Sequence, residues 1–130
     1  MGLWAFRCYD VGDRGCPWRR WYDDLAEEFQ ASHDEVFDRL ETQLIWTTPD
    51  VDFIDKENRI IEIRLTGNVK HRIGGFHAGT RKEFVVLGFW YHKQRVYTPA
   101  DIKKTLAKRK KEVIAYPERA VSCARPQGTE

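Results

Sequence analysis

A group of basic and aromatic residues between positions 64 and 95 could bind phosphate groups and cleave RNA. Its members are Arg64, Lys70, Arg72, Tyr91, His92, Lys93 and Arg95. Cleavage of RNA without a metal needs a base for the 2′-hydroxyl, an acid for the leaving 5′-oxygen and cations for the phosphate charge. His92 can transfer a proton near neutral pH, and Tyr91 or a desolvated lysine is a weaker candidate. These residue types would equally suit passive phosphate binding.

The group belongs to a strongly basic half of the chain. Residues 1–58 hold 6 Lys and Arg against 14 Asp and Glu, whereas residues 59–116 hold 14 against 4. A concentrated positive region attracts polyanions and speeds their encounter with the protein. The charge pattern therefore favours nucleic acid as the ligand.

Several other chemistries have no support in the sequence. There is no GxGxxG, Walker loop, HExxH, nucleophile elbow or CxxC pair, so we expect no nucleotide cofactor and no serine or zinc hydrolysis. The four histidines lack ligand spacing, so no metal site is expected either.

The three cysteines, Cys8, Cys16 and Cys123, leave an odd thiol. An odd number argues against a disulfide framework or a four-cysteine zinc site and favours a reducing compartment. The first ten residues include charged side chains and no apolar stretch long enough for a signal or a membrane span. We therefore expect a soluble, cytoplasmic protein that does not contact a membrane.

The basic residues are positioned by an expected β-hairpin. Residues 59–65 and 69–76 are two short strands, separated by the turn residues 66–68. A register that keeps the apolar residues on one face pairs Leu65 with Val69, Ile63 with His71 and Ile61 with Ile73. The other face then carries Arg64 opposite Lys70 and Glu62 opposite Arg72. Like charges facing each other are unfavourable and suggest an anion site, although Glu62 supplies a partner and weakens that inference.

Each candidate has a simpler interpretation. Arg64 and Arg72 would serve equally as ordinary exposed sheet residues. His71 falls on the apolar face of the hairpin, so a core histidine is favoured over a catalytic one. For His92, a solvated position at a strand end is the alternative to proton transfer.

The hairpin is followed by a third strand and a helix. Residues 84–91 form an apolar run typical of a central strand. Thr98 and Pro99 are typical of a helix start, and a helix over residues 99–115 would bury Ile102, Leu106 and Val113. Its basic face includes Lys103 and Lys104, which could contact RNA or only keep the helix soluble.

The acidic half is expected to form a strand and a helical hairpin. Residues 3–9 predict a strand, and apolar spacings of three and four from Pro17 to Phe29 predict a helix that buries Trp18 and Trp21. A capping box from Ser32 to Glu35 predicts a second helix, which continues to about residue 46. Residues 47–58 are expected to be a loop.

The order β-α-α-β-β-β-α predicts an α+β fold, in which an N-terminal strand and a helical hairpin pack on a small antiparallel sheet before a C-terminal helix. We expect a single domain over residues 1–116. Residues 117–130 lack periodicity and are expected to be a flexible tail.

Four short segments in order resemble the RelE/ParE superfamily of bacterial toxins, and its HigB branch in particular. Glu62-Ile63-Arg64 is similar to the "ELR" motif of that branch, and His71-Arg72-Ile73 to its aromatic-Arg-hydrophobic strand. Residues 88–93 are similar to its third strand end, and residues 98–109 to its "TP" helix start. The similarity departs from the family at His92-Lys93, where paired lysines are usual, at His71, where an aromatic is usual, and in the longer segment from 89 to 99.

The resemblance implies a fold and a function. The fold would be RelE-like, and the protein would be a toxin that inhibits translation by cleaving mRNA in the ribosomal A site through 2′-hydroxyl attack. Arg64 and Arg72 would hold the scissile phosphate beside Lys70, while His92, Lys93 and Arg95 would transfer protons or stabilise the leaving group. Its partners would be mRNA, the ribosome and a cognate antitoxin, expected to be a helix-turn-helix protein, and no cofactor would be needed.

Two functions of other classes stay open. One is a non-enzymatic inhibitor of DNA gyrase, similar to the ParE side of the superfamily; His92 and the two arginines argue against it, because a passive inhibitor needs no acid and base. The other is an RNA-binding module that does not cleave. Its binding constant would fall with salt, and each phosphate contact would add about 0.7 to 0.9 to the steepness of a plot of log binding constant against log salt concentration.

Overall fold

The computed structural model of the protein describes residues 3–11, 16–47, 51–65, 71–78, 82–93 and 96–123, with the backbone alone at residues 92, 93, 96 and 98. The helices are α1 (Pro17–Asp24), α2 (Glu27–Glu41), α3 (Ile102–Ala115) and the short 3-10 helix η2 (Pro117–Arg119). The strands are β1 (Ala5–Tyr9), β2 (Val51–Asp55), β3 (Ile60–Arg64), β4 (His71–Ala78), β5 (Glu83–Lys93), β6 (Val96–Thr98) and β7 (Ala120–Ser122).

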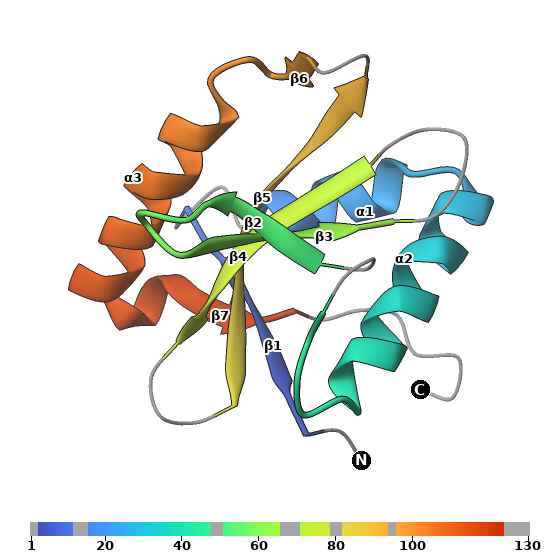
Figure 1. Ribbon diagram of the computed structural model, residues 1–130, viewed down its shortest axis with the longest axis horizontal. Helices are drawn as coiled ribbons and strands as arrows, with labels where there is room; N and C mark the ends of the chain where they lie inside the picture. Colours follow the sequence, from blue (N-terminus) through green and yellow to red (C-terminus); the bar gives the residue numbers. More distant parts are fainter. Residues whose placement is uncertain are drawn as a thin grey trace.

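The described strands form one sheet between two helical layers. Its order is β2-β3-β4-β5-β1-β7, and β6 pairs with the far end of β5. The β1–β5 pair is parallel and the other pairs are antiparallel. Helices α1 and α2 lie on one side of the sheet and α3 on the other (Figure 1). The expected α+β fold with a mostly antiparallel sheet is confirmed.

Alternation along the strands divides the core between the two faces of the sheet. The face under α1 and α2, here the helical-hairpin face, buries Ile63, Ile73 and Phe84 with Phe37 of α2. The face under α3, here the α3 face, buries Ile60, Leu87 and Trp90 with residues of that helix. As expected, Ile102, Leu106 and Val113 are the buried positions of α3.

The helical hairpin breaks earlier than the sequence predicts. Helix α1 ends at Asp24, Leu25 has an extended backbone, and α2 already begins at Glu27. Ser32, expected to cap the second helix, therefore lies inside it. The expected burial of Trp18 is confirmed, since only 2% of the residue is exposed and its indole nitrogen donates to Nε2 of the buried His33.

The β3–β4 register differs by two residues from the prediction. The structure pairs Ile63 with Ile73 and Arg64 with Arg72, and the amide of Leu65 donates to the carbonyl of His71. A shift of two keeps every side chain on its expected face, because side chains alternate with a period of two. The partners change, however: Arg64 faces Arg72 instead of Lys70, and Glu62 faces Gly74 instead of Arg72.

Two segments expected to be unstructured contain strands. Residues 51–55 of the expected loop form β2, the outermost strand beside β3. Residues 117–122 of the expected tail form η2 and β7, and β7 pairs with β1. Residues 124–130 of that tail lie outside the described part of the chain.

Cys8 and Cys123 form a disulfide across the β1–β7 pair, with a Cα–Cα separation of 5.3 Å. The prediction that the cysteines argue against disulfides was therefore wrong for this pair. Disulfides are rare in cytosolic proteins, so the bond also removes the support that the cysteines gave to a reducing compartment. Cys16 remains a free thiol, and burial raises its pKa.

Gly75 allows β4 and β5 to approach closely at a bulge. A Cβ built there would lie 2.1 Å from the carbonyl oxygen of Val85 and 2.6 Å from the Phe84 ring. Because the carbonyl belongs to the sheet backbone, we expect Gly75→Ala to lower the free energy of unfolding by about 3 kcal/mol in urea denaturation.

Gly88→Ala is the matched control for that prediction. Its Cβ would first meet the ends of the Leu106 and Arg109 side chains, at 3.0 and 3.3 Å, and these can move. An equal loss of stability in both variants would contradict the assigned close contact at Gly75.

Candidate active site

The candidate site is centred on an arginine pair on the α3 face of the sheet. Arg64, the last residue of β3, lies directly opposite Arg72 of β4. Side chains opposite each other in an antiparallel pair have Cβ atoms only about 4.5–5.5 Å apart. The structure therefore brings together the two arginines that the sequence selected.

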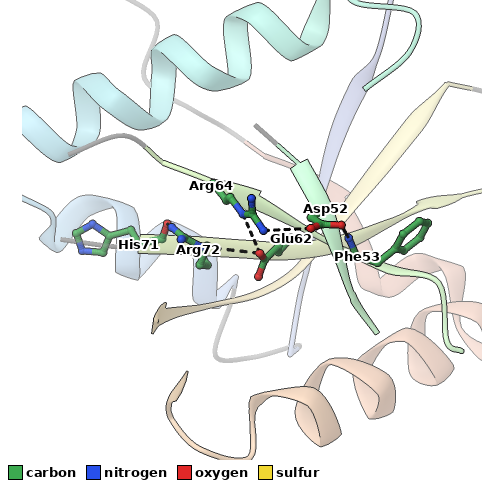
Figure 2. Close-up of polar contacts among 6 residues, drawn as sticks. All are labelled: Asp52, Phe53, Glu62, Arg64, His71 and Arg72. Carbon is green, nitrogen blue, oxygen red and sulfur yellow. Dashed lines mark hydrogen bonds and ion pairs between the residues drawn. The ribbon is translucent and has the colours of Figure 1, made fainter. Parts of the chain in front are cut away.

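Two carboxylates hold these arginines. The Glu62 carboxylate accepts a hydrogen bond from Nε of Arg64 at 3.0 Å and lies 4.0 Å from Nε of Arg72. Asp52 of β2 accepts a second bond from Arg64, from Nη2 at 3.2 Å. Figure 2 shows Glu62 between the two guanidinium groups and Asp52 on the far side of Arg64. The formal charges of these four groups cancel.

Arg72 is the more buried of the two arginines. Its side chain is 11% exposed, against 36% for Arg64. Burial lowers the pKa of the Arg72 guanidinium from its ordinary value; the charge of Glu62 opposes this shift and that of Arg64 adds to it. Nη1 of Arg72 donates to the carbonyl of His71 at 3.1 Å.

Two buried N–H groups on this face have no hydrogen-bond acceptor among the described residues. They are Nε of Arg72 and Nε1 of Trp90, which lies opposite Arg72 on β5. Buried donors without an acceptor are costly and uncommon in folded proteins. The site therefore has hydrogen-bonding capacity left for an oxygen-bearing ligand or a water molecule.

The other candidates lie around this pair or outside the description. Tyr91 is 43% exposed, and its ring lies 4.9 Å from that of His71, on the helical-hairpin face rather than the α3 face. The backbones of His92 and Lys93 continue β5 and pair with Tyr97 and Val96 of β6. Lys70 and Arg95 lie outside the described residues.

The two lysines at the start of α3 are exposed, as their RNA-binding interpretation requires. Nζ of Lys103 lies 5.8 Å from the centre of the Tyr97 ring, and Lys104 follows it in the first turn. Lys110, from the same lysine-rich helix, instead donates to the carbonyl of Asn58 and so anchors the β2–β3 turn.

Sequence reasoning missed Asp52 and Trp90. Asp52 falls in the expected loop, although the apolar residues Val51 and Phe53 flank it with the alternation of a short strand. Trp90 was treated only as part of an apolar run. Its position opposite Arg72 follows from the β4–β5 pairing, which the sequence does not specify.

His71 is a core histidine, as its place on the apolar face predicts. The residue is 3% exposed, and its ring lies against Phe29, Tyr91 and Trp21. Burial lowers the pKa of His71, and the charge of Arg72 lowers it further. His71 and Arg72 are consecutive residues of β4, so their side chains point to opposite faces of the sheet.

The lowered pKa of His71 predicts a loss of stability in weak acid. Below its ordinary value of 6.5 the unfolded chain takes up a proton that the folded protein resists, so the free energy of unfolding falls as the pH falls from 6.5 towards the folded pKa. His77, whose pKa is also lowered by burial, contributes in the same direction. We expect His71→Phe to flatten this dependence in urea unfolding between about pH 7.5 and 5. An unchanged slope would contradict the assignment of a neutral His71.

The described residues contain no group of three or more His, Cys, Asp or Glu side chains placed to hold a metal ion. Within the same ranges, every helix is too short or too polar to cross a lipid bilayer.

Comparison with known proteins assigns the chain to no family. No family model matches it, and no curated protein matches it in sequence.

Proposed function

We propose that the protein is the toxin of a type II toxin–antitoxin system, an endoribonuclease that cleaves mRNA on the ribosome. The fold would be of the RelE type, with the α3 face at Arg64 and Arg72 as the active face. The observation that carries the proposal is the direct opposition of these two arginines across β3 and β4. Like charges opposite each other are unfavourable in a sheet. Glu62 and Asp52 offset this pair in the free protein, and the phosphate of a substrate would take over that role when RNA binds.

The carboxylates would keep the arginines in place until RNA binds. Nε of Arg72 has no hydrogen-bond acceptor and lies 4.0 Å from Glu62, so it gains a bond if a phosphate oxygen displaces that carboxylate. A charge-assisted hydrogen bond of this kind is stronger than a neutral one. Glu62 is in this account a positioning residue, and the arginines are catalytic residues.

The reaction would be an internal transfer of the phosphoryl group. The 2′-oxygen forms a bond to phosphorus, and the bond from phosphorus to the 5′-oxygen breaks. The products are a 2′,3′-cyclic phosphate and a 5′-hydroxyl, and no water or metal is consumed. A base takes the proton of the 2′-hydroxyl and an acid supplies one to the 5′-oxygen, with His92 and Lys93 as the candidates for these steps.

The arginines would contribute most in the transition state. Arg64 and Arg72 stabilise the extra negative charge that develops on the phosphate oxygens. Lys70 and Arg95 would bind neighbouring nucleotides, and Lys103 and Lys104 would attract the RNA backbone. Tyr91 lies on the helical-hairpin face, so its position does not support the expected role in RNA binding. The protein would act in the cytoplasm, where mRNA and ribosomes are, and an antitoxin protein would neutralise it.

Induction in growing bacteria followed by mapping of mRNA 5′ ends tests the proposal. We expect growth arrest together with new cuts within translated regions. Growth arrest with intact transcripts would contradict it. A supercoiling assay with purified protein then identifies a gyrase inhibitor, and salt-dependent RNA binding without cleavage identifies a passive binding module.

A further inference from the structure

The Cys8–Cys123 disulfide joins a buried strand to a segment on the surface. Cys8 lies on β1 and is 0% exposed. Cys123 is only partly buried and directly follows β7, which is the outermost strand beside β1 in the described sheet (Figure 1). A reductant can therefore approach the bond from the side of Cys123.

Residues 117–123, here the β7 segment, are loosely packed on the rest of the protein. None of these residues is buried. A cleft of about 650 Å³ lies between the segment and the sheet, and its lining includes Ala120 of the segment and Phe76 and Val85 of the sheet. At the edge of this cleft, Nη1 of Arg7 donates to the carbonyl of Ala120 at 3.2 Å. Segments with few buried apolar contacts open locally more readily than the core does.

The polar contacts of the β7 segment are few. Strand β7 pairs with β1 over three residues. Two backbone hydrogen bonds flank this pairing: the amide of Cys123 donates to the carbonyl of Phe6, and the amide of Asp10 donates to the carbonyl of Arg119. The ion pair between Arg119 and Glu112 is partly exposed on both sides, so it contributes little. The disulfide is therefore the main restraint that keeps this segment on β1.

We propose that the Cys8–Cys123 bond is a reversible redox switch that controls whether the β7 segment stays on the sheet. A dithiol reductant opens the bond. One of its thiolates attacks Sγ of Cys123 and displaces Cys8, and its second thiol then displaces Cys123 from the mixed disulfide. Both cysteines end as thiols and the dithiol ends as a cyclic disulfide, so two electrons and two protons pass to the protein. The β7 segment then leaves β1, and the rest of the sheet stays folded.

Release of the β7 segment changes the surface around β1. The backbone groups of β1 that pair with β7 between Arg7 and Tyr9 lose their strand partner, and the cleft loses the wall that the segment forms. The reduced protein thus presents a sheet edge that the oxidised protein covers. The arginine pair on β3 and β4 keeps its neighbours, because β5 and β1 lie between it and β7. The switch does not depend on the proposed ribonuclease activity.

Hydrogen–deuterium exchange of the full chain, with and without dithiothreitol in native buffer, tests the proposal. We expect reduction to speed exchange in residues 120–123 by about tenfold or more, while β4 and β5 stay protected over the same short labelling time. Glutathione disulfide should restore slow exchange. Cys123→Ser, which cannot form the bond, should exchange fast in this segment with or without reductant. Cys16→Ala is the matched control and should respond like the wild type, because Cys16 is a free thiol that packs against the same core cluster.

Three results would overturn the proposal. Loss of protection across β4 and β5 within the same labelling time would show that the bond supports the whole fold. Unchanged exchange of the β7 segment in the reduced wild-type protein would show that the noncovalent contacts are enough to hold it. A bond that dithiothreitol does not reduce in the folded protein would be a permanent structural bond and not a switch.

Discussion

Arg72→Gln is expected to reduce mRNA cleavage by about 10²- to 10³-fold, with the main loss in the rate of the chemical step. Loss of a single preorganised donor to a developing oxyanion has an effect of this size. Arg72 is placed for such a role because its guanidinium is largely buried and its Nε has no acceptor of its own. Single-turnover cleavage on programmed ribosomes measures the effect.

Two controls make the Arg72 result interpretable. Lys108→Gln removes the same charge from an exposed position of α3 and should leave the cleavage rate almost unchanged. Thermal unfolding must show that Arg72→Gln is folded, because the side chain is more buried than an exposed strand residue. If Arg72→Gln does not fold, Arg64→Gln provides the same test at a more exposed position. A folded Arg72→Gln protein that cleaves at the wild-type rate would remove Arg72 from the mechanism.

Loss of the Cys8–Cys123 disulfide is expected to lower the free energy of unfolding by about 4 to 5 kcal/mol. The bond joins residues 115 positions apart, and closing a loop of that length strongly restricts the unfolded chain. Urea unfolding of Cys123→Ala should show this loss, and the oxidised wild-type protein treated with a thiol reductant should show a similar one.

Cys16→Ala is the matched control for the disulfide, because Cys16 is free and should contribute little to stability. Alkylation of the unfolded, unreduced protein should modify Cys16 alone. Modification of all three cysteines, or a Cys123→Ala protein as stable as the wild type, would show that the bond does not form.

The sequence predicted the faces of the hairpin better than its pairing. Alternation of apolar and charged residues placed Arg64 and Arg72 on one face and His71 on the other, and a shift of two residues cannot change those faces. The shift did change the neighbours, because the apolar alternation that selects the register is the same for two registers that differ by two residues. The opposition of Arg64 and Arg72 is therefore a result of the structure.

Contacts between distant segments account for most of the other differences. Strand β7 forms because β1 offers it an edge, and the disulfide arises where these strands meet, 115 residues apart in sequence. No local pattern near Cys123 indicates this pairing. Likewise, Asp52 reaches Arg64 only because β2 pairs with β3, and residues 47–58 had been predicted as a loop from their proline and acidic residues.

The chemistry of the cut RNA ends tests the central claim most directly. Purified protein is incubated with ribosomes carrying an mRNA, and the same mRNA with one 2′-deoxynucleotide at the cut site is compared. We predict fragments that end in a 2′,3′-cyclic phosphate and begin with a 5′-hydroxyl, and no cleavage at the deoxynucleotide. Cleavage of the deoxy substrate at that site, or fragments with 5′-phosphate ends, would contradict attack by the 2′-hydroxyl.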